Sequence, residues 1–408
     1  METAGRFPLW LFVLGAMSAI GGLSIDMYLP SFVLIAKDLQ ASGGMVQLTL
    51  AGFFLGYASG QLVCGPLSDR FGRKPLLYIG LGIFISTSLG CMLAPNVLFL
   101  VGLRFLQGLG ACAGIVVGRA TIRDKCGPEE SAKAYSMMML VSGLSPVLAP
   151  LLGGWTMLLF GWRAIFAVLV LGGLICLVLM HFKLEETLDR SKTAPFRVAA
   201  VARQYGVLLG DRYFVACALC GGLIHAGVFA YVSSSPAILI NAFGVPAQNY
   251  GLVFGANALG MITVAQINAR VVRRFPLEVL LQKAIALMVA SAFFMLILQL
   301  SGFNTLWVML VGFFVFISSF GAIAPNASAL AMTKHGKYSG TASALLGAIH
   351  FSLSTVSCMV VSIWQDGTAL PLLTVASLCA LASMLVRYYM IQPRTIAKIS
   401  TECSQTTT

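Results

Sequence analysis

Long apolar stretches recur along nearly the whole chain and are separated by short polar segments. Each stretch has about 20 residues, the length of helix that spans the roughly 30 Å hydrocarbon core of a membrane. The first six lie near residues 9–30, 46–64, 76–94, 98–118, 132–153 and 161–181. Six more lie near residues 213–240, 248–268, 279–300, 304–330, 339–363 and 369–391. The pattern therefore predicts an all-α membrane protein with twelve transmembrane helices.

A polar stretch, Gly65–Pro75, lies between the second and third apolar stretches. It contains Asp69, Arg70, Arg73 and Lys74, and this density of charge is too costly to place in lipid. Its two glycines and two prolines suit a tight turn. We therefore expect a polar turn that joins two membrane helices, and its three basic residues place it in the cytoplasm.

The basic residues follow this topology. With the N-terminus inside, all but three of the 26 Lys and Arg residues fall on the cytoplasmic side. The exceptions are Lys37 and Arg163, which fall outside, and Arg104, which lies within a helix. The net charge of +12 is thus spread over many short loops, which indicates membrane topology and no nucleic-acid partner. We expect a multi-pass protein of the bacterial cytoplasmic (inner) membrane with both termini in the cytoplasm.

Composition excludes several other classes. A chain with 58% hydrophobic and 10% charged residues has no ordinary soluble surface. The ten cysteines lie mostly singly in apolar stretches, and even Cys217 and Cys220 fit helix packing better than a metal site or a disulfide. No phosphate-binding glycine loop and no nucleophile with a base is visible, so we expect neither a nucleotide-driven pump nor an enzyme. The first apolar stretch has no cleavage site and is predicted to be a retained helix.

The twelve helices divide into two sets of six. We predict an N-terminal bundle (1–182), a cytoplasmic linker (183–211), a C-terminal bundle (212–392) and a cytoplasmic tail (393–408). A shift of 204 residues aligns Leu55-Gly56 with Leu259-Gly260, and Arg70-Phe71 with Arg274-Phe275. Two similar halves are typical of a transporter with its substrate site between them.

Three motifs resemble those of the major facilitator superfamily. Residues that resemble motif A are Gly65, Asp69, Arg70, Gly72, Arg73 and Lys74. Those that resemble motif B are Arg104, Gln107 and Gly108. Those that resemble motif C, which marks proton-coupled antiporters, are Gly143, Pro146, Pro150, Gly153 and Gly154. The family usually has Gly where this chain has Ala149. The segments Ser24–Pro30 and Ser233–Pro236 resemble the Bcr/CflA branch of twelve-helix drug:proton antiporters, whose members export antibiotics such as bicyclomycin and the phenicols.

The resemblance implies the major facilitator fold, with two pseudo-symmetric six-helix bundles around a central cavity. It also implies a monomer in the lipid bilayer that exports drugs or other small amphipathic molecules by alternating access. Protons would drive the export, without a cofactor or a metal. Two alternatives stay open: transport of a specific metabolite such as a siderophore, amino acid or nucleobase, and a channel.

Asp26 and Arg104 are the charged residues expected inside the first six helices, where a charge is expensive. At 1.5 Å per residue they lie roughly 6 Å and 9 Å from the outer ends of their helices. Because they share a depth, we expect a proton-coupling pair in which a partly dry cavity disfavours the charged form of Asp26. The alternative is a fixed ion pair that ties the two helices together.

The resemblance assigns further roles. A charge cluster that latches the halves in the outward-facing state would consist of Asp69, Arg70, Arg73 and Asp124. The alternative is that these are ordinary charges of a cytoplasmic loop, an explanation that suits the acidic Asp69 least. Gly143, Pro146, Pro150, Gly153 and Gly154 would form a hinge on helix five, since small residues let helices approach and prolines bend them. Generic close packing is the alternative.

Two histidines lie at membrane depth in the second half. His225 and His350 are candidates for proton transfer, although a histidine in such a position more often bonds a neighbouring helix. Substrate-binding candidates are Tyr28, Tyr57, Gln107, Tyr231, Ser234 and His225, together with Phe229. In a chain with 26 Phe residues, most aromatic side chains face lipid or core.

Overall fold

A computed structural model describes residues 8–188, 198–303, 305–333 and 339–391. Within these ranges twelve helices are long and apolar enough to cross a membrane, which confirms the predicted number. The predicted tail (393–408), the middle of the predicted linker (189–197) and the loop residues 334–338 lie outside the described residues.

The first half contains eight α-helices, which we call the N-half. They are α1 (Leu9–Asp26), α2 (Phe32–Asp38), α3 (Gly43–Phe71), α4 (Arg73–Met92), α5 (Val97–Lys125), α6 (Pro128–Gly143), α7 (Ser145–Phe160) and α8 (Arg163–Lys183), with a short 3₁₀ turn η1 (Leu29–Ser31) between α1 and α2. α1, η1 and α2 form one membrane span, and α6 and α7 contribute another. Both composite spans contain prolines, which interrupt the backbone hydrogen-bond ladder.

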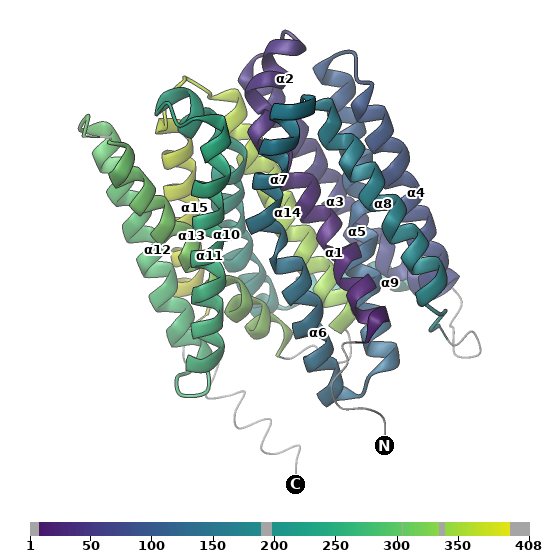
Figure 1. Ribbon diagram of the computed structural model, residues 1–408. Coiled ribbons are helices and arrows are strands. Elements are labelled where there is room, and N and C mark those ends of the chain that lie inside the picture. Colours follow the sequence, from purple (N-terminus) through teal and green to yellow (C-terminus); the bar gives the residue numbers. More distant parts are fainter. Residues whose placement is uncertain (1–7, 189–197, 304, 334–338, 392–408) are drawn as a thin grey trace.

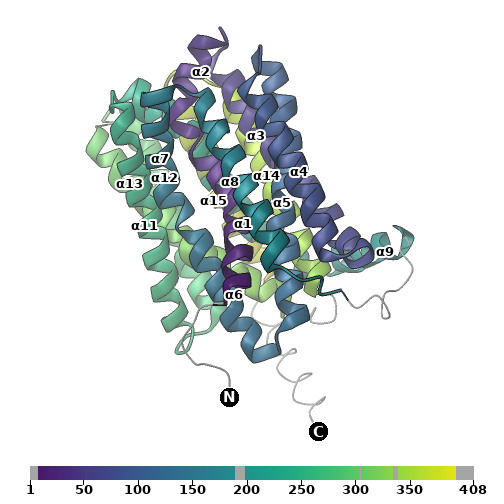
Figure 2. The same cartoon turned by 45° about the vertical axis from the view of Figure 1, so that its right-hand side comes forward.

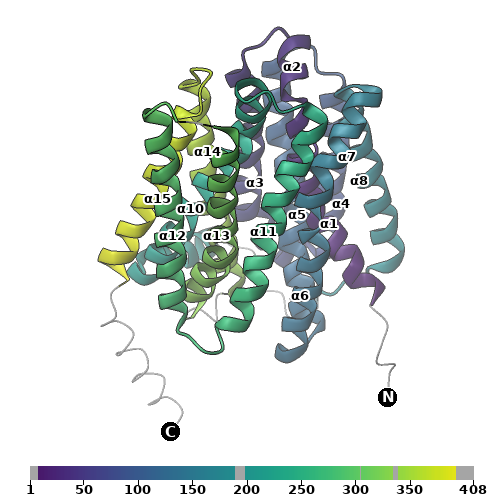
Figure 3. The same cartoon turned by 60° about the vertical axis from the view of Figure 1, so that its left-hand side comes forward.

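The second half, which we call the C-half, repeats the arrangement. It consists of α10 (Arg212–Pro236), a π-helix η3 (Ala237–Ala242), α11 (Ala247–Val271), α12 (Leu277–Leu300), α13 (Leu306–Met332), α14 (Ser339–Ile363) and α15 (Leu370–Met390). Figure 3 shows the two halves standing side by side, green to yellow on one side and purple to blue on the other.

Equivalent glycines mark equivalent helix contacts in the two halves. In the N-half, α3 packs on α5, and a Cβ at Gly56 would meet the backbone oxygen of Phe105. In the C-half, α11 packs on α13, and a Cβ at Gly260 would meet Ser318. These are glycines that the internal alignment superimposes, so the repeat is visible in packing as well as in sequence.

The halves meet along two helix pairs, α3 with α14 and α7 with α11. We call the end of the bundle that carries Asp69 the Asp69 end, and the end that carries α2 the Asp38 end (Figure 1). At the Asp38 end, Ser362 Oγ donates to the backbone oxygen of Gly44 at 2.6 Å. Towards the Asp69 end, Arg119 Nη1 donates to Ser343 Oγ at 2.6 Å. α14 is therefore bonded to the N-half near both ends, to α3 at the Asp38 end and to α5 towards the Asp69 end.

The expected turn over Gly65–Pro75 is wrong in extent. α3 continues through Pro66 to Phe71, α4 begins at Arg73, and only Gly72 joins the two helices. Gly72 has φ +110°, which a residue with a side chain rarely adopts. The charges do not require a loop, because Arg73 has ion-pair partners on neighbouring helices and its side chain is only 3% exposed.

A helix not predicted from the sequence lies within the described part of the linker. α9 (Val198–Gly210) runs crosswise at the Asp69 end, as Figure 2 shows. Its Tyr205 hydroxyl donates to the backbone oxygen of Leu62 in α3 at 3.0 Å. Thr341 of α14 donates to Gln204 at 3.0 Å. α9 thus contacts both halves.

Candidate functional site

Asp26 is the last residue of α1 and lies where the first span is interrupted. Pro30 has no N–H to donate to the carbonyl of Asp26, so the helix cannot continue regularly. The Asp26 side chain is buried, and the turn η1 that follows it packs against α10 and α11 of the C-half. The Tyr250 hydroxyl shares a hydrogen bond with Ser235 Oγ at 2.7 Å. Asp26 therefore lies where the first span meets the C-half.

Arg104 of α5 is enclosed within the N-half and has no exposed surface. Its guanidinium carbon lies 4.6 Å from the ring centre of Tyr28 and 4.5 Å from that of Phe53. Nη1 donates to Gln107 Oε1 at 2.6 Å and to Ser24 Oγ at 3.4 Å. Nε and Nη2 have no hydrogen-bond partner among the described residues. The charge is stabilised by two aromatic faces and one amide.

The alternative of a fixed ion pair between Asp26 and Arg104 is wrong, because no ion pair in the described ranges joins them. Ser24 and Tyr28, four residues apart, lie on the side of the span that meets Arg104. Asp26 is midway between them in sequence and points to the other side. Equal depth did not bring the two charged groups together because they lie on opposite sides of the first span.

Three of the four candidate latch residues, Asp69, Arg73 and Asp124, come together. Arg73 Nη1 contacts Asp69 Oδ1 at 2.6 Å, and Nε contacts Asp124 Oδ2 at 2.9 Å. Nη1 also donates to Ser68 Oγ at 2.6 Å. Arg70 is exposed and forms no ion pair with the described residues. The cluster lies wholly on N-half helices, α3, α4 and α5.

Sequence reasoning missed Glu186, which follows α8 and caps the N-terminus of α4. Its carboxylate accepts hydrogen bonds from the backbone N–H groups of Arg73 at 3.0 Å, Lys74 at 3.1 Å and Leu188 at 2.9 Å. Burial raises the pKa of Glu186, but these backbone donors outweigh it and lower the pKa below its ordinary value. A Cβ at Gly72 would lie 2.6 Å from the carboxylate. The sequence feature that could have identified Glu186 is an acidic residue at an end of the bundle where most charged residues are basic.

The residues predicted for the hinge have different environments. α6 ends at Gly143, α7 begins at Ser145, and Pro146 lies in the first turn of α7, so the helix is interrupted at this point. A Cβ at Gly153 would meet the backbone of Met27 in the first span. Gly154 has open space, and Pro150 lies inside α7. Gly153 thus lets this helix approach the segment that carries Asp26 closely.

Two of the substrate candidates, Tyr57 and His225, meet at the boundary between the halves. The ring of Phe351 in α14 lies 4.6 Å from that of Tyr57 and 4.9 Å from that of His225. His225 also stacks on Phe229 at 4.3 Å, and its Nδ1 is 2.7 Å from Ser354 Oγ. Aromatic side chains of both halves thus pack against one another at their boundary.

Other aromatic and histidine side chains extend this cluster. Phe54 of α3 contacts Phe229 at 4.8 Å, and His350 lies 5.5 Å from His225. Phe54, Phe229, Phe351 and His350 join Tyr57 and His225 in what we call the aromatic cluster. Two helices of the C-half and one of the N-half supply it.

The remaining substrate candidates lie elsewhere. Tyr28 and Gln107 surround Arg104. Tyr231 accepts a hydrogen bond from Asn257 at 2.7 Å and packs on Phe313 within the C-half. Ser234 lines a separate cavity at the Asp38 end. With Phe229 in the aromatic cluster, the seven candidates thus fall into four places.

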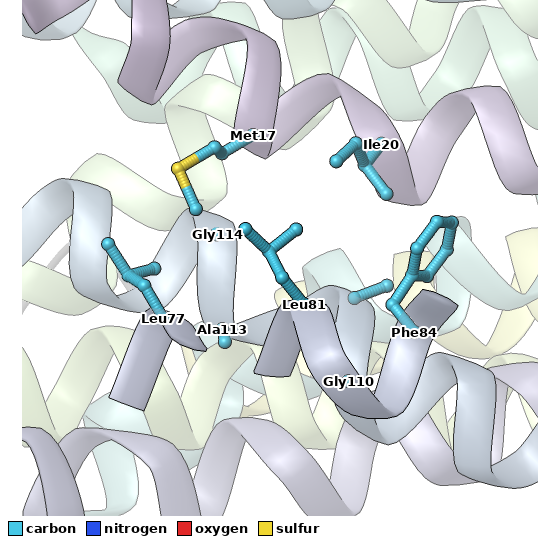
Figure 4. A pocket seen from close by; sticks show the side chains of 9 residues that line it. Met17, Ile20, Leu77, Leu81, Phe84, Gly110, Ala113 and Gly114 are labelled. Atoms are coloured by element: carbon cyan, nitrogen blue, oxygen red, sulfur yellow. The ribbon is translucent and has the colours of Figure 1, made fainter. Parts of the chain in front are cut away.

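A small cavity between α1, α4 and α5 is not a candidate site. Its volume is about 10 Å³, and its side chains, among them Met17, Leu81 and Phe84, are apolar (Figure 4). A buried water needs roughly this much space and also two to four polar partners. In the described ranges no group of three His, Cys, Asp or Glu side chains is placed to hold a metal ion.

Comparisons with known proteins agree with this architecture. Residues 14–357 match the sequence profile of the Major Facilitator Superfamily. The chain is 37% identical to the "Uncharacterized MFS-type transporter YdgK" of Bacillus subtilis, over 94% of this chain and 95% of that protein. It is 32% identical to the "Bicyclomycin resistance protein homolog" of Haemophilus influenzae, over 94% and 96%. Identity to the "Multidrug resistance protein MdtL" of Escherichia coli O157:H7 is 34%, over 64% and 65%.

Solved structures share the fold. The D-xylose-proton symporter superimposes with a TM-score of 0.75 at 14% identity, covering 94% of this chain and 98% of that one. The xylose transporter XylE from E. coli, in a partially occluded inward-open conformation, gives a TM-score of 0.69 at 14% identity with the same coverage.

Proposed function

Because the chain belongs to the Major Facilitator Superfamily, and is therefore a transporter and not an enzyme, we propose that it exports small amphipathic molecules, drugs among them, in exchange for protons. The relatives named for bicyclomycin resistance and multidrug resistance support drug export. Export of a specific metabolite is the second candidate.

The observation that carries the proposal is the position of Asp26. A buried carboxyl without an ion pair accepts a proton readily, because burial disfavours its charged form. It lies next to η1, which packs against α10 and α11 of the C-half, so its charge affects how the halves fit together. Substrate binds from the cytoplasm while Asp26 is ionised. A proton that arrives from outside neutralises Asp26 and favours the conformation that releases substrate outside.

Arg104 has a positioning role in this scheme. It contacts Ser24 and Tyr28 on the same span as Asp26, and its buried charge is expensive unless these contacts persist. Arg104 therefore fixes the rotation of the span, and the aromatic cluster supplies the apolar binding surface.

Orientation is part of the same proposal. The charge asymmetry of the loops places the Asp69 end in the cytoplasm. An alkaline phosphatase fusion after residue 70 is expected to be inactive, whereas strong activity of that fusion would reverse the assignment.

The test compares wild type with Asp26→Asn in proteoliposomes under an imposed pH gradient. Compounds are first chosen from a susceptibility panel of a pump-deficient bacterium that expresses the chain, which also separates a drug exporter from a metabolite carrier. In the Asn variant we expect uphill export and substrate-induced proton release to be lost.

Asp38→Asn is the matched control. Asp38 lies in the same span and accepts a hydrogen bond from Trp162 at 3.0 Å, but its side chain is 46% exposed at the end of the bundle. This variant should export normally. If Asp26→Asn still exported drug uphill with proton exchange, coupling would reside elsewhere, and His225 and His350 would be tested next.

A further inference from the structure

A second cavity lies between the halves at the Asp38 end and has a volume of about 60 Å³. Gln47 of α3 contributes from the N-half, while Ser234 of α10, Asn241 of the π-helix and Gln365 and Thr368 of the α14–α15 connection contribute from the C-half. Asn241 and Thr368 are exposed, so the cavity reaches the surface at this end. We call it the Gln47–Ser234 pocket.

Two polar atoms in this pocket lack partners. Gln47 and Ser234 are each only 2% exposed, yet Gln47 Oε1 and Ser234 Oγ form no hydrogen bond with the described residues. A buried polar atom without a partner is costly, and buried polar groups in native proteins are nearly always satisfied by protein, water or ligand. The pocket therefore requires an occupant that both donates and accepts hydrogen bonds.

The lining also limits the charge and size of the occupant. Its polar side chains are amides and hydroxyls, and no charged side chain belongs to it. A charged group would enter without a counter-charge, which is unfavourable. Drug-sized sites have volumes of roughly 300–1,000 Å³, so about 60 Å³ accommodates only a small part of a molecule.

The position of the pocket relates it to the proposed coupling site. Ser235, the neighbour of Ser234, bonds to Tyr250 of α11, and both α10 and α11 pack against η1, which lies close after Asp26 in the chain. Consecutive helix residues point in different directions, so α10 presents Ser235 to α11 and Ser234 to the pocket. The π-helix that supplies Asn241 follows directly, and such irregular turns are frequent at functional sites.

We propose that the Gln47–Ser234 pocket is an exit subsite, which holds the uncharged hydroxyl or amide end of the transported molecule before it leaves at the Asp38 end. This assignment rests on the proposed export function. The transported molecules are then amphipathic and neutral at one end, with an apolar part that suits the aromatic cluster. Water alone in the pocket is the competing outcome.

The test measures access to the pocket without requiring transport. Ser234→Cys places a thiol in the lining, and the purified protein in nanodiscs is alkylated with neutral iodoacetamide or with charged iodoacetate. Each rate is divided by the rate of the same reagent with free cysteine, and labelling of wild type is subtracted. We expect a preference of about tenfold for the amide, the discrimination that one or two hydrogen bonds provide. Adding Gln47→Leu should remove most of this preference.

Controls fix the interpretation. Ser233→Cys, one residue earlier, lies outside the lining and is fully buried, so it should not react. If Ser234→Cys does not yield folded protein, Ala237→Cys gives the same readout from a partly buried position in the lining. Equal normalised rates at the pocket would indicate water alone, and no reaction with either reagent would indicate a closed site. Both results overturn the proposal.

A transport arm separates this proposal from the function. The double variant Gln47→Leu/Ser234→Ala should export neutral panel compounds at least several-fold more slowly than wild type, while Ser233→Ala should not. Selective labelling without any export would retain the pocket and refute the exporter. Export with unselective labelling would retain the exporter and refute the exit subsite.

Discussion

Asp124→Ala should destabilise the protein more than Asp69→Ala, although Asp69 lies closer to Arg73. The distances from Arg73 are 2.6 Å to Asp69 and 2.9 Å to Asp124, but the side chains are 60% and 20% exposed, respectively. A hydrogen bond to a charged group that is shielded from water contributes about 1.5–3 kcal/mol. A largely exposed ion pair contributes about 0–1 kcal/mol. We therefore expect losses of about 1.5–3 kcal/mol for Asp124→Ala and below about 1 kcal/mol for Asp69→Ala.

Thermal unfolding in nanodiscs checks this order. For a unit the size of the N-half, 1 kcal/mol corresponds to roughly 2–4 °C in Tm. Asp124→Ala should therefore lower Tm by roughly 3–12 °C, and Asp69→Ala by less than about 4 °C. Arg70→Ala is the control and should change little, because Arg70 is exposed and has no ion pair with the described residues. A larger loss for Asp69→Ala than for Asp124→Ala would refute the argument from burial.

Asp69 has a second contact that bears on conformation. It lies 4.0 Å from Arg123, and a Cβ at Gly340 of α14 would lie 2.8 Å from the Arg123 guanidinium. The cluster thus reaches the C-half through Arg123. Asp69→Asn should lower transport while substrate binding stays largely intact, since the change alters the balance of conformations. Transport equal to wild type would contradict the latch.

Two further predictions concern helix ends and helix packing. Glu186→Gln should lower the free energy of unfolding by about 0.5–1 kcal/mol at pH 7, the low end for a helix cap, because the side chain is partly solvated. The pKa of Glu186 is lowered in the folded protein, so the stabilisation by its carboxylate is present above the ordinary pKa of 4.5 and disappears as the pH falls below that value. Melting curves of variant and wild type between pH 7 and 3 would show this loss. Gly108→Ala should sharply reduce the yield of monodisperse protein, because the added Cβ would meet the backbone oxygen of Phe53. Gly102→Ala on the same helix has open space around the added Cβ and should leave the yield unchanged. Equal yields of the two variants would contradict this argument from packing.

The number and order of the spanning helices could be predicted because length and apolar content decide them. The shared level of Asp26 and Arg104 was also predicted, and the contacts of Arg104 with Ser24 and Tyr28 agree with it. The distance of Asp26 from the outer end was not, because the first span continues through η1 and α2 to Asp38 and does not end near Pro30. The direction in which a side chain points around the helix axis could not be predicted, since it depends on how each helix packs. For this reason Asp26 lies at the level of Arg104 but points away from it.

Contacts between distant segments were equally beyond the sequence. Glu186 caps a helix that begins 113 residues earlier, and the aromatic cluster combines side chains of α3, α10 and α14. The turn at Gly72 was misjudged for a related reason. Charged residues predict a loop only when they lack partners, and Arg73 has Asp69 and Asp124.

The bridging position of α9 has a consequence for the order of synthesis. When α9 is made, Leu62 already exists and can accept the hydrogen bond from Tyr205. Thr341, the partner of Gln204, has not yet been synthesised, because it lies more than a hundred residues further along the chain. A newborn chain can therefore seat α9 on the completed N-half before any helix of the C-half enters the membrane. The segment between the halves then serves as a template at the Asp69 end, where α14 later finds its place against α3.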